Sequence, residues 1–302
     1  MLVFMSVPGY LLKRAKRLPE DLAGGLVTIL LYVSLPALTI YSFAGKEYQP
    51  RLLVNILLTA FFSAVFLVLG FFISKLIFAR MPEAPEKNIC IASGFMNNCA
   101  FMGIPVFLVL FPGDAEPIIY ATVFGVIFNM FTWTLLTYTL TGDKKYISLR
   151  KAFINPPSLS LIVALPVFFW GLKIPAPLMT MLDSLGGLTS PLSMFLLGLH
   201  LADIRPRSLF ESPRVYESVA IKLIVVPLVS LGILLLINLA MPLDRVLISS
   251  MFLIMGMPTA FSVIMFSEIY GSDSGSAARS ILISSVLSIA TIPFLMEMTK
   301  LI

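Results

Sequence analysis

Charged residues are scarce in this chain of 302 residues. Asp, Glu, Lys and Arg make up 12% of it, and 58% is hydrophobic. A soluble domain carries about 25% charged residues. The composition therefore excludes an ordinary soluble domain and predicts an all-α polytopic protein of the lipid bilayer. The net charge of +5 does not indicate a nucleic-acid partner, because the basic residues lie in short loops, where they set membrane topology.

Histidine and cysteine are also scarce, and this limits the chemistry that the chain can perform. It has one histidine and two cysteines, Cys90 and Cys99, which share one apolar stretch. We interpret them as buried thiols rather than a disulfide or metal framework. A single histidine cannot build a usual zinc site, and intramembrane proteolysis would need clustered acids or histidines at depth. We therefore expect no enzyme activity, no catalytic residue, no metal and no cofactor. A channel is disfavoured as well, because selectivity filters usually need a symmetric ring of subunits.

Stretches without any charged residue are long. A membrane span needs about 20 mostly apolar residues, with a range of about 17–25. Nine stretches meet this need: residues 22–45, 52–74, 88–113, 117–142, 152–172, 184–202, 223–243, 246–267 and 280–296. Residues 1–12 are too short to span on their own, so we interpret them as a tenth segment that stops partway or lacks its outer end. The sequence thus predicts ten transmembrane helices.

The basic residues predict how these helices are oriented. With both termini outside, 16 of the 21 lysines and arginines fall on the inner side, as the positive-inside rule requires. We expect a multi-pass protein of the cell membrane, with a first five-helix repeat at 1–142, a cytoplasmic loop at 143–152 and a second repeat at 153–302. Because five is odd, the second repeat enters the membrane inverted relative to the first.

One tripeptide pattern recurs at matching points of the two halves. Gly103-Ile104-Pro105 interrupts the fourth apolar run, and Gly256-Met257-Pro258 interrupts the ninth. Each follows an earlier intramembrane proline at a similar spacing, 69 residues after Pro36 and 67 after Pro191. A single proline can merely kink a membrane helix. Matched breaks in two inverted repeats instead favour a secondary transporter in which the broken fourth and ninth helices cross at the substrate site.

The breaks also suggest what is bound. Two half-helices that start at mid-membrane direct free N–H groups and positive dipole ends at the same place, which suits a carboxylate. Asn97 and Asn98 precede the first break and Thr259 follows the second. We therefore predict a substrate site with these members: Asn97, Asn98, Gly103, Pro105, Asn129, Gly256, Pro258 and Thr259.

Two of the candidate side chains admit a second interpretation. Asn129 in the fifth span either reaches the crossing or holds two helices together. Lys222 in the eighth span either snorkels to the headgroups or is the counter-charge of the bound anion.

The motifs resemble those of a known family. Residues 98–105 (NCAFMGIP) are similar to the Asn-x-x-x-x-Gly-x-Pro signature of the auxin efflux carriers, which include plant auxin carriers and prokaryotic organic-acid carriers. Residues 257–261 with 266–271 resemble the ninth span of that family, and residues 32–38 its second.

The resemblance implies a static scaffold of spans one, two, six and seven, which often forms a homodimer, and a moving domain built from the other spans. It implies that substrate binds where spans four and nine cross, that Asn98 contacts its carboxylate, and that the moving domain slides like an elevator. Plant members place an acid and a base inside the third span, whereas residues 52–74 contain neither. This departure favours the short prokaryotic branch.

A sodium-coupled organic-anion symporter of the bile acid symporter type is the alternative, since such symporters and NhaA-like antiporters share the inverted five-plus-five plan. The sequence contains no mid-membrane acid beside Pro105 or Pro258. Coupling to H⁺ or to Na⁺ stays open at this point.

Overall fold

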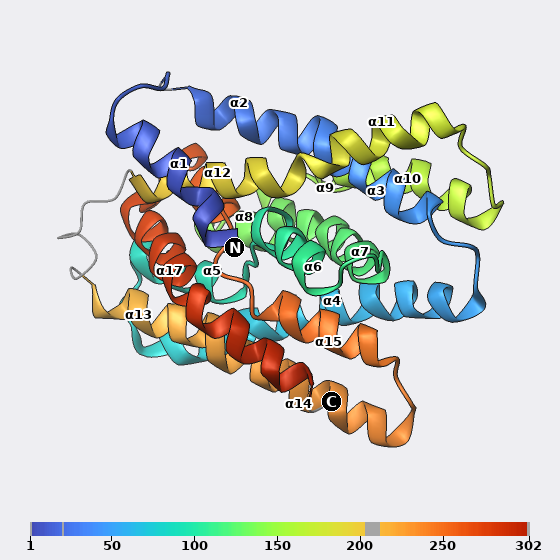
Figure 1. Cartoon of the computed structure of the whole chain (residues 1–302). Helices are drawn as coiled ribbons and strands as arrows, with labels where there is room; N and C mark the ends of the chain where they lie inside the picture. Colours follow the sequence, from blue (N-terminus) through green and yellow to red (C-terminus); the bar gives the residue numbers. More distant parts are fainter. Residues whose placement is uncertain (1, 20, 203–211, 301–302) are drawn as a thin grey trace. The chain divides into compact units, whose positions relative to one another are not determined.

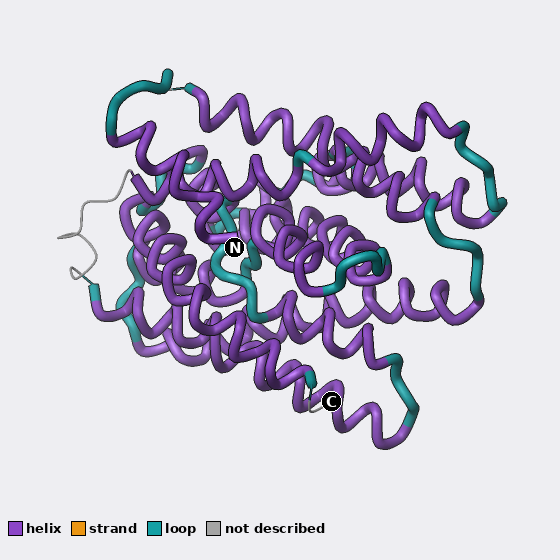
Figure 2. The backbone as a smooth tube through the Cα atoms, in the orientation of Figure 1, coloured by secondary structure: helices purple, strands orange, loops and turns teal. Residues whose placement is uncertain are grey.

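The computed structural model describes residues 2–19, 21–202 and 212–300. This part of the chain is built from helices and the loops that join them (Figure 2), and it contains no β-strand, only one isolated bridge between Asn97 and Thr259. The all-α class predicted from the sequence is confirmed.

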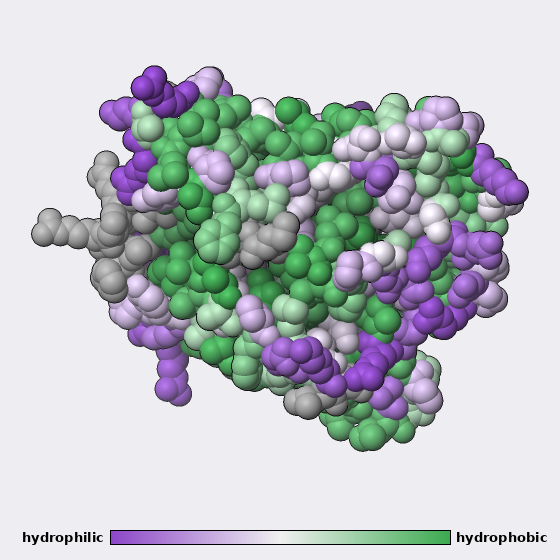
Figure 3. Space-filling view, viewed as in Figure 1, coloured by the Kyte–Doolittle hydropathy of each residue, from purple (hydrophilic) through white to green (hydrophobic). Residues whose placement is uncertain are grey.

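Among the described residues, six helical segments are long and apolar enough to cross a membrane: 22–44, 50–80, 116–141, 176–202, 213–240 and 274–299. They overlap the second, third, fifth, seventh, eighth and tenth predicted spans, and the seventh and eighth begin eight and ten residues earlier than predicted. Shorter apolar helices cover 99–110, 156–169 and 245–255. Several large apolar side chains, among them Leu239 and Leu76, lie largely exposed on the surface of the protein. Apolar residues cover much of the visible surface (Figure 3). Lipid is the environment that suits such faces, and the chain is a multi-pass membrane protein.

The contacts divide the chain into two compact units. The first comprises residues 1–57, 100–126 and 154–204, and the second comprises 58–99, 127–153 and 205–302. Each unit takes segments from both predicted repeats. Spans one, two, six and seven, which the resemblance assigns to the scaffold, all lie in the first unit, together with residues 100–126. The repeat boundary at 143–152 stays a prediction.

Figure 1 labels the helices that make up most of the first unit. They are α1 (Leu2–Arg14), α2 (Leu22–Ile29), α3 (Leu35–Ala44), α6 (Ile104–Leu110), α10 (Pro156–Phe169), α11 (Ala176–Gly187) and α12 (Thr189–Ala202). The first turns of α4 (Pro50–Ile77) and most of α7 (Glu116–Phe131) also belong to it.

Glycines bring α1 and α12 together inside this unit. A Cβ on Gly9 would overlap the backbone of Phe195, and one on Gly198 would overlap the backbone of Ser6. Small residues at such an interface let membrane helices approach closely. Helix α3 packs against α10 and α11, with Phe43 edge-to-face on Phe168.

The second unit holds the rest of α4 and α7 and the remaining helices. These are α5 (Pro85–Phe95), α8 (Thr137–Thr141), α9 (Leu149–Phe153), α13 (Pro213–Ala220), α14 (Val226–Ala240), α15 (Arg245–Met255), α16 (Ser262–Ile269) and α17 (Ser274–Thr299). Helix α5 contacts α13, α16 and α17, while α15 contacts α14 and α17. Cys90 and Cys99 are buried and form no disulfide with each other, as predicted.

In the part of the chain that the structure describes, three helical segments widen into a π-turn just before a proline. The π-turns span Leu30–Ser34, Cys99–Gly103 and Ile221–Val225, and each ends two residues before Pro36, Pro105 or Pro227. Proline has no N–H to donate, and its ring clashes with the carbonyl one turn earlier. The wider turn relieves that clash, so the helix continues through the proline.

Candidate functional site

Two unwound segments pair with each other inside the second unit. The N–H of Asn98 donates to the Pro258 carbonyl at 2.8 Å, and the N–H of Ala260 donates to the Met96 carbonyl at 3.1 Å. Asn97 and Thr259 face each other between these bonds in an antiparallel bridge. Every backbone group that leaves a helix at membrane depth needs a partner within the protein. The pairing supplies such partners, and we call residues 96–98 with 258–260 the crossing.

The break in the fourth apolar run differs from the prediction. Helix α5 ends at Phe95, and helical structure resumes at Cys99, so the interruption falls at 96–98 and not at Gly103-Ile104-Pro105. Pro105 lies within the first turn of α6, directly after a π-turn. The reason is that the wider turn absorbs the proline, whereas Asn97 and Asn98 are held in the extended pairing. Gly103 and Pro105 belong to the first unit.

The break in the ninth run lies where the sequence predicts it. Helix α15 ends at Met255 and α16 begins at Ser262, so Gly256 and Pro258 are both in the unwound stretch. A Cβ on Gly256 would overlap the side chain of Leu295 in α17. This close packing requires glycine at the end of α15.

Thr259 fixes the crossing to its neighbours. It is fully buried. Its N–H donates to Ser284 Oγ at 3.1 Å, and its hydroxyl donates to the Ser93 carbonyl at 3.2 Å. Through these bonds Thr259 connects the end of α5 and the middle of α17, and its oxygen retains acceptor capacity for a ligand.

The two asparagines are buried at the crossing, with exposed fractions of 1% for Asn97 and 3% for Asn98. Asn97 Nδ2 donates weakly to Met255 Sδ at 3.4 Å. Its Oδ1 is buried with no hydrogen-bond partner among the described residues. A buried polar atom in that state points to a ligand or ordered water in the working protein.

Lys222 does not reach the membrane surface. It lies in the π-turn Ile221–Val225, its exposed fraction is 0%, and Nζ donates to the Met255 carbonyl at 2.8 Å. The snorkelling interpretation is therefore wrong, because the side chain extends into the protein. Met255 accepts two hydrogen bonds, one from Lys222 at its carbonyl and one from Asn97 at its sulfur. Lys222 therefore belongs to the surroundings of the crossing. Asn129 is half-buried near the end of α7, and its part in the site stays a prediction.

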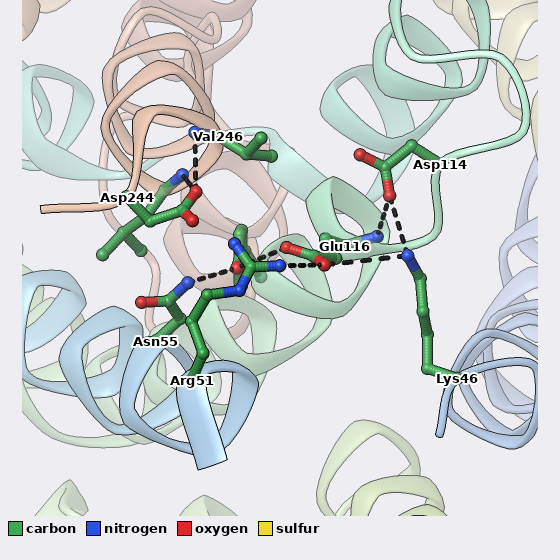
Figure 4. A network of polar contacts seen from close by, with 9 residues as sticks. Lys46, Arg51, Asn55, Asp114, Glu116, Asp244 and Val246 are labelled. Atoms are coloured by element: carbon green, nitrogen blue, oxygen red, sulfur yellow. Dashed lines mark hydrogen bonds and ion pairs between the residues drawn. The ribbon is translucent and has the colours of Figure 1, made fainter. Parts of the chain in front are cut away.

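A second polar cluster lies in the first unit, where Glu116 begins α7 (Figure 4). Glu116 Oε1 is 2.7 Å from Arg51 Nη2 and 3.7 Å from Lys46 Nζ. Its Oε2 accepts from the Tyr120 hydroxyl at 3.1 Å, and Asn55 Nδ2 donates to that hydroxyl at 3.0 Å. Lys46 also pairs with Asp114 at 3.1 Å. We call these six residues the Glu116 cluster.

Comparison with known proteins assigns the sequence to a family. The sequence profile of the family described as "Membrane transport protein" matches residues 1–149 and 143–296. The chain belongs to this family, the auxin efflux carriers. It is 24% identical over 301 residues to a "Putative malonate transporter" of Rhizobium meliloti (strain 1021), an alignment that covers 97% of this chain and 92% of that protein. Members of the auxin efflux carrier family are transporters, not enzymes.

Sequence reasoning missed several residues around this carrier's crossing. Met255, Ser93 and Ser284 all bond to predicted site residues, yet nothing in their local pattern distinguishes them from other apolar or small residues of a span. The Glu116 cluster was missed too. Its signal was the position of Asp114 and Glu116 between two apolar runs, which does not tell which basic residues approach them.

Proposed function

We propose that this chain is a secondary transporter that moves a small organic anion, a carboxylate, across the cell membrane. The observation that carries the proposal is the crossing, in which two broken helices of a transporter-family chain pair at buried residues 96–98 and 258–260. Half-helix ends at such breaks are where carriers bind substrate and coupling ions. The relative named for malonate transport supports a short dicarboxylate as the first substrate to test.

The proposed substrate site combines neutral donors with one cation. The amide of Asn98 contacts the carboxylate, and the amide of Asn97 and the hydroxyl of Thr259 complete the polar surface. Helical structure resumes at Cys99, directly after 96–98, and at Ser262, separated by one residue from 258–260, so two positive helix ends act on the same anion. Lys222 supplies the counter-charge. Gly256 and Pro258 shape the unwound backbone beside these groups, while Gly103, Pro105 and Asn129 stay predicted members of the site.

The proposed membrane plan has ten spans in two inverted repeats, with both termini outside. The helices support it through a pattern that occurs twice. In each half a short first segment is followed by two long helices, a broken helix and another long helix. In the first half these are α1, 22–44, 50–80, α5 with α6, and 116–141. In the second half they are α10, 176–202, 213–240, α15 with α16, and 274–299. Matching patterns in two halves are typical of inverted-repeat carriers.

The proposed mechanism is an elevator. Spans one, two, six and seven act as the scaffold and the dimer interface, and the domain with the crossing slides against them. The contacts support this assignment in part, because all four scaffold spans cluster in one unit, whereas the paired segments of the crossing cluster in the other.

Transport assays on purified protein test the proposal. Proteoliposomes are loaded with unlabelled malonate and supplied with radiolabelled malonate outside, and a panel of mono- and dicarboxylates is used to compete. We expect counterflow that small carboxylates inhibit. A protein that exchanges none of these acids while remaining monodisperse would contradict the proposed function.

The site is tested by Asn98→Ala. Loss of a hydrogen bond to a charged group costs about 1.5–3 kcal/mol, or roughly 10–150-fold in affinity, so we expect malonate binding to weaken by that factor. Asn88→Ala is the matched control, because Asn88 is a half-buried asparagine earlier on α5, and it should bind as the wild type does. Unchanged affinity in Asn98→Ala would remove Asn98 from the site.

A further inference from the structure

Lys222 occupies the carbonyl end of a broken helix. Its Nζ lies 2.8 Å from the carbonyl of Met255, which is the last residue of α15. The N–H groups of Gly256 and Met257 turn back to carbonyls earlier in α15. The Met255 carbonyl is therefore left for the lysine. No Asp or Glu of the described chain forms an ion pair with Lys222 within 4.0 Å.

That position is the one a coupling cation would use. The last carbonyls of a helix lack intrahelical partners and carry the negative end of its dipole. In carriers with broken helices, unwound carbonyls and half-helix C-terminal ends coordinate Na⁺ or H⁺. Here the ammonium group of Lys222 donates a hydrogen bond to the last carbonyl of α15, that of Met255. A second cation on the same carbonyl would be strongly repelled at such short range inside the protein.

The neighbouring groups fit the same view. Asn97 donates to the side chain of Met255, and its Oδ1 is a buried acceptor without a partner among the described residues. Met255 O and Asn97 Oδ1 are both oxygen atoms, which hard cations prefer as ligands. If the ammonium were removed, the Met255 carbonyl would lose its donor, and the end of α15 would lose the positive charge that faces it.

We propose that Lys222 is the resident cation of the crossing and takes the place of a coupling sodium ion. This inference rests on the proposed function, and it selects sodium-independent transport over the sodium-coupled alternative. The lysine neutralises the end of α15 and offers its remaining N–H donors to the substrate carboxylate. The anion is therefore bound without an accompanying metal ion.

The first test compares cations on the wild-type protein. Uptake of radiolabelled malonate into proteoliposomes is measured in sodium chloride and in choline chloride, with the membrane potential held at zero. We expect equal initial rates. A requirement for sodium would overturn the inference while leaving the proposed anion transport intact.

The second test uses thermal unfolding in detergent, which needs no substrate. The midpoint is compared in sodium chloride and in choline chloride at equal ionic strength, for the wild type and for Lys222→Ala. A ligand that binds only the folded state raises its stability. We expect sodium or methylammonium to raise the midpoint of Lys222→Ala but not that of the wild type. Lys75→Ala, which removes an exposed lysine of the same unit, should behave as the wild type.

The results separate two failures. If the wild type carries no acid of the panel, the proposed function fails, and the detergent comparison still decides whether Lys222 stands in for sodium. Sodium stabilisation of the wild type, or sodium-free transport by Lys222→Gln at the wild-type rate, would overturn the inference. If Lys222→Ala does not fold, Lys222→Gln and Lys222→Arg replace it. Lys222→Gln is expected to bind malonate roughly tenfold or more weakly, and Lys222→Arg to retain sodium-independent uptake.

Discussion

The Glu116 cluster offers a stability prediction that can be worked out in detail. Glu116→Gln keeps the size of the side chain and removes its charge. In the wild type the side chain of Glu116 is 10% exposed, and its carboxylate lies 2.7 Å from Arg51. The Tyr120 hydroxyl donates to the same carboxylate. The substitution therefore leaves Arg51 beside a neutral amide and should lower the free energy of unfolding.

The expected magnitude lies between two limits. Breaking a fully buried ion pair costs about 3–5 kcal/mol, whereas an exposed pair contributes about 0–1 kcal/mol. The side chain of Arg51 is 51% exposed, so solvent screens much of its charge. Lys46 retains Asp114 at 3.1 Å. We therefore expect Glu116→Gln to cost roughly 1–2 kcal/mol, and less at high salt, where the pair is screened.

Reversible unfolding in mixed micelles measures this cost. Asp143→Asn is the matched control, because Asp143 pairs with Lys145 where both side chains are well exposed, at 43% and 66%. That change should stay within about 0.5 kcal/mol. A double-mutant cycle with Arg51→Gln isolates the pair. Additive effects in the cycle, or equal costs for Glu116→Gln and Asp143→Asn, would refute the reasoning.

Two further predictions concern packing and orientation. Gly198→Ala should lower the unfolding midpoint by several degrees, because a Cβ there would fall on the backbone of Ser6 and Tyr10 in α1. Gly24→Ala is the control and should leave the midpoint unchanged, because a Cβ at Gly24 meets nothing within 4 Å. Equal midpoints for the two variants would contradict the close α1–α12 contact. Lys144→Cys should react with an impermeant thiol reagent only after cells are permeabilised, since the positive-inside rule places it in the cytoplasm, and labelling in intact cells would show the orientation to be inverted.

The long helices were predictable from the sequence because their cause is local. A charge-free stretch of about 20 residues suits the hydrocarbon core of a membrane, and each of the six full-length candidate spans among the described residues overlaps such a stretch. The interruption at Gly256 and Pro258 was predictable as well, since it follows from backbone chemistry. Pro105 was misinterpreted because a π-turn can absorb a proline, and the local sequence does not say which turn will widen.

The surroundings of the crossing depend on tertiary contacts, which the sequence pattern does not contain. Periodicity gives the depth of Lys222 along its span but not whether the side chain reaches lipid headgroups or protein, so the snorkelling interpretation was wrong. Met255 offers its carbonyl because α15 ends there, which only the folded chain reveals. Asn97 and Asn98, which the sequence places ahead of a predicted break at Gly103-Ile104-Pro105, form the break themselves.

The most direct test of the central claim is an experimental structure of the carrier with malonate bound. We expect ligand density at the crossing, with a carboxylate oxygen within hydrogen-bond distance of the Asn98 side chain and beside the paired segments 96–98 and 258–260. Malonate bound elsewhere, with the crossing unchanged and empty at saturating concentration, would contradict the account.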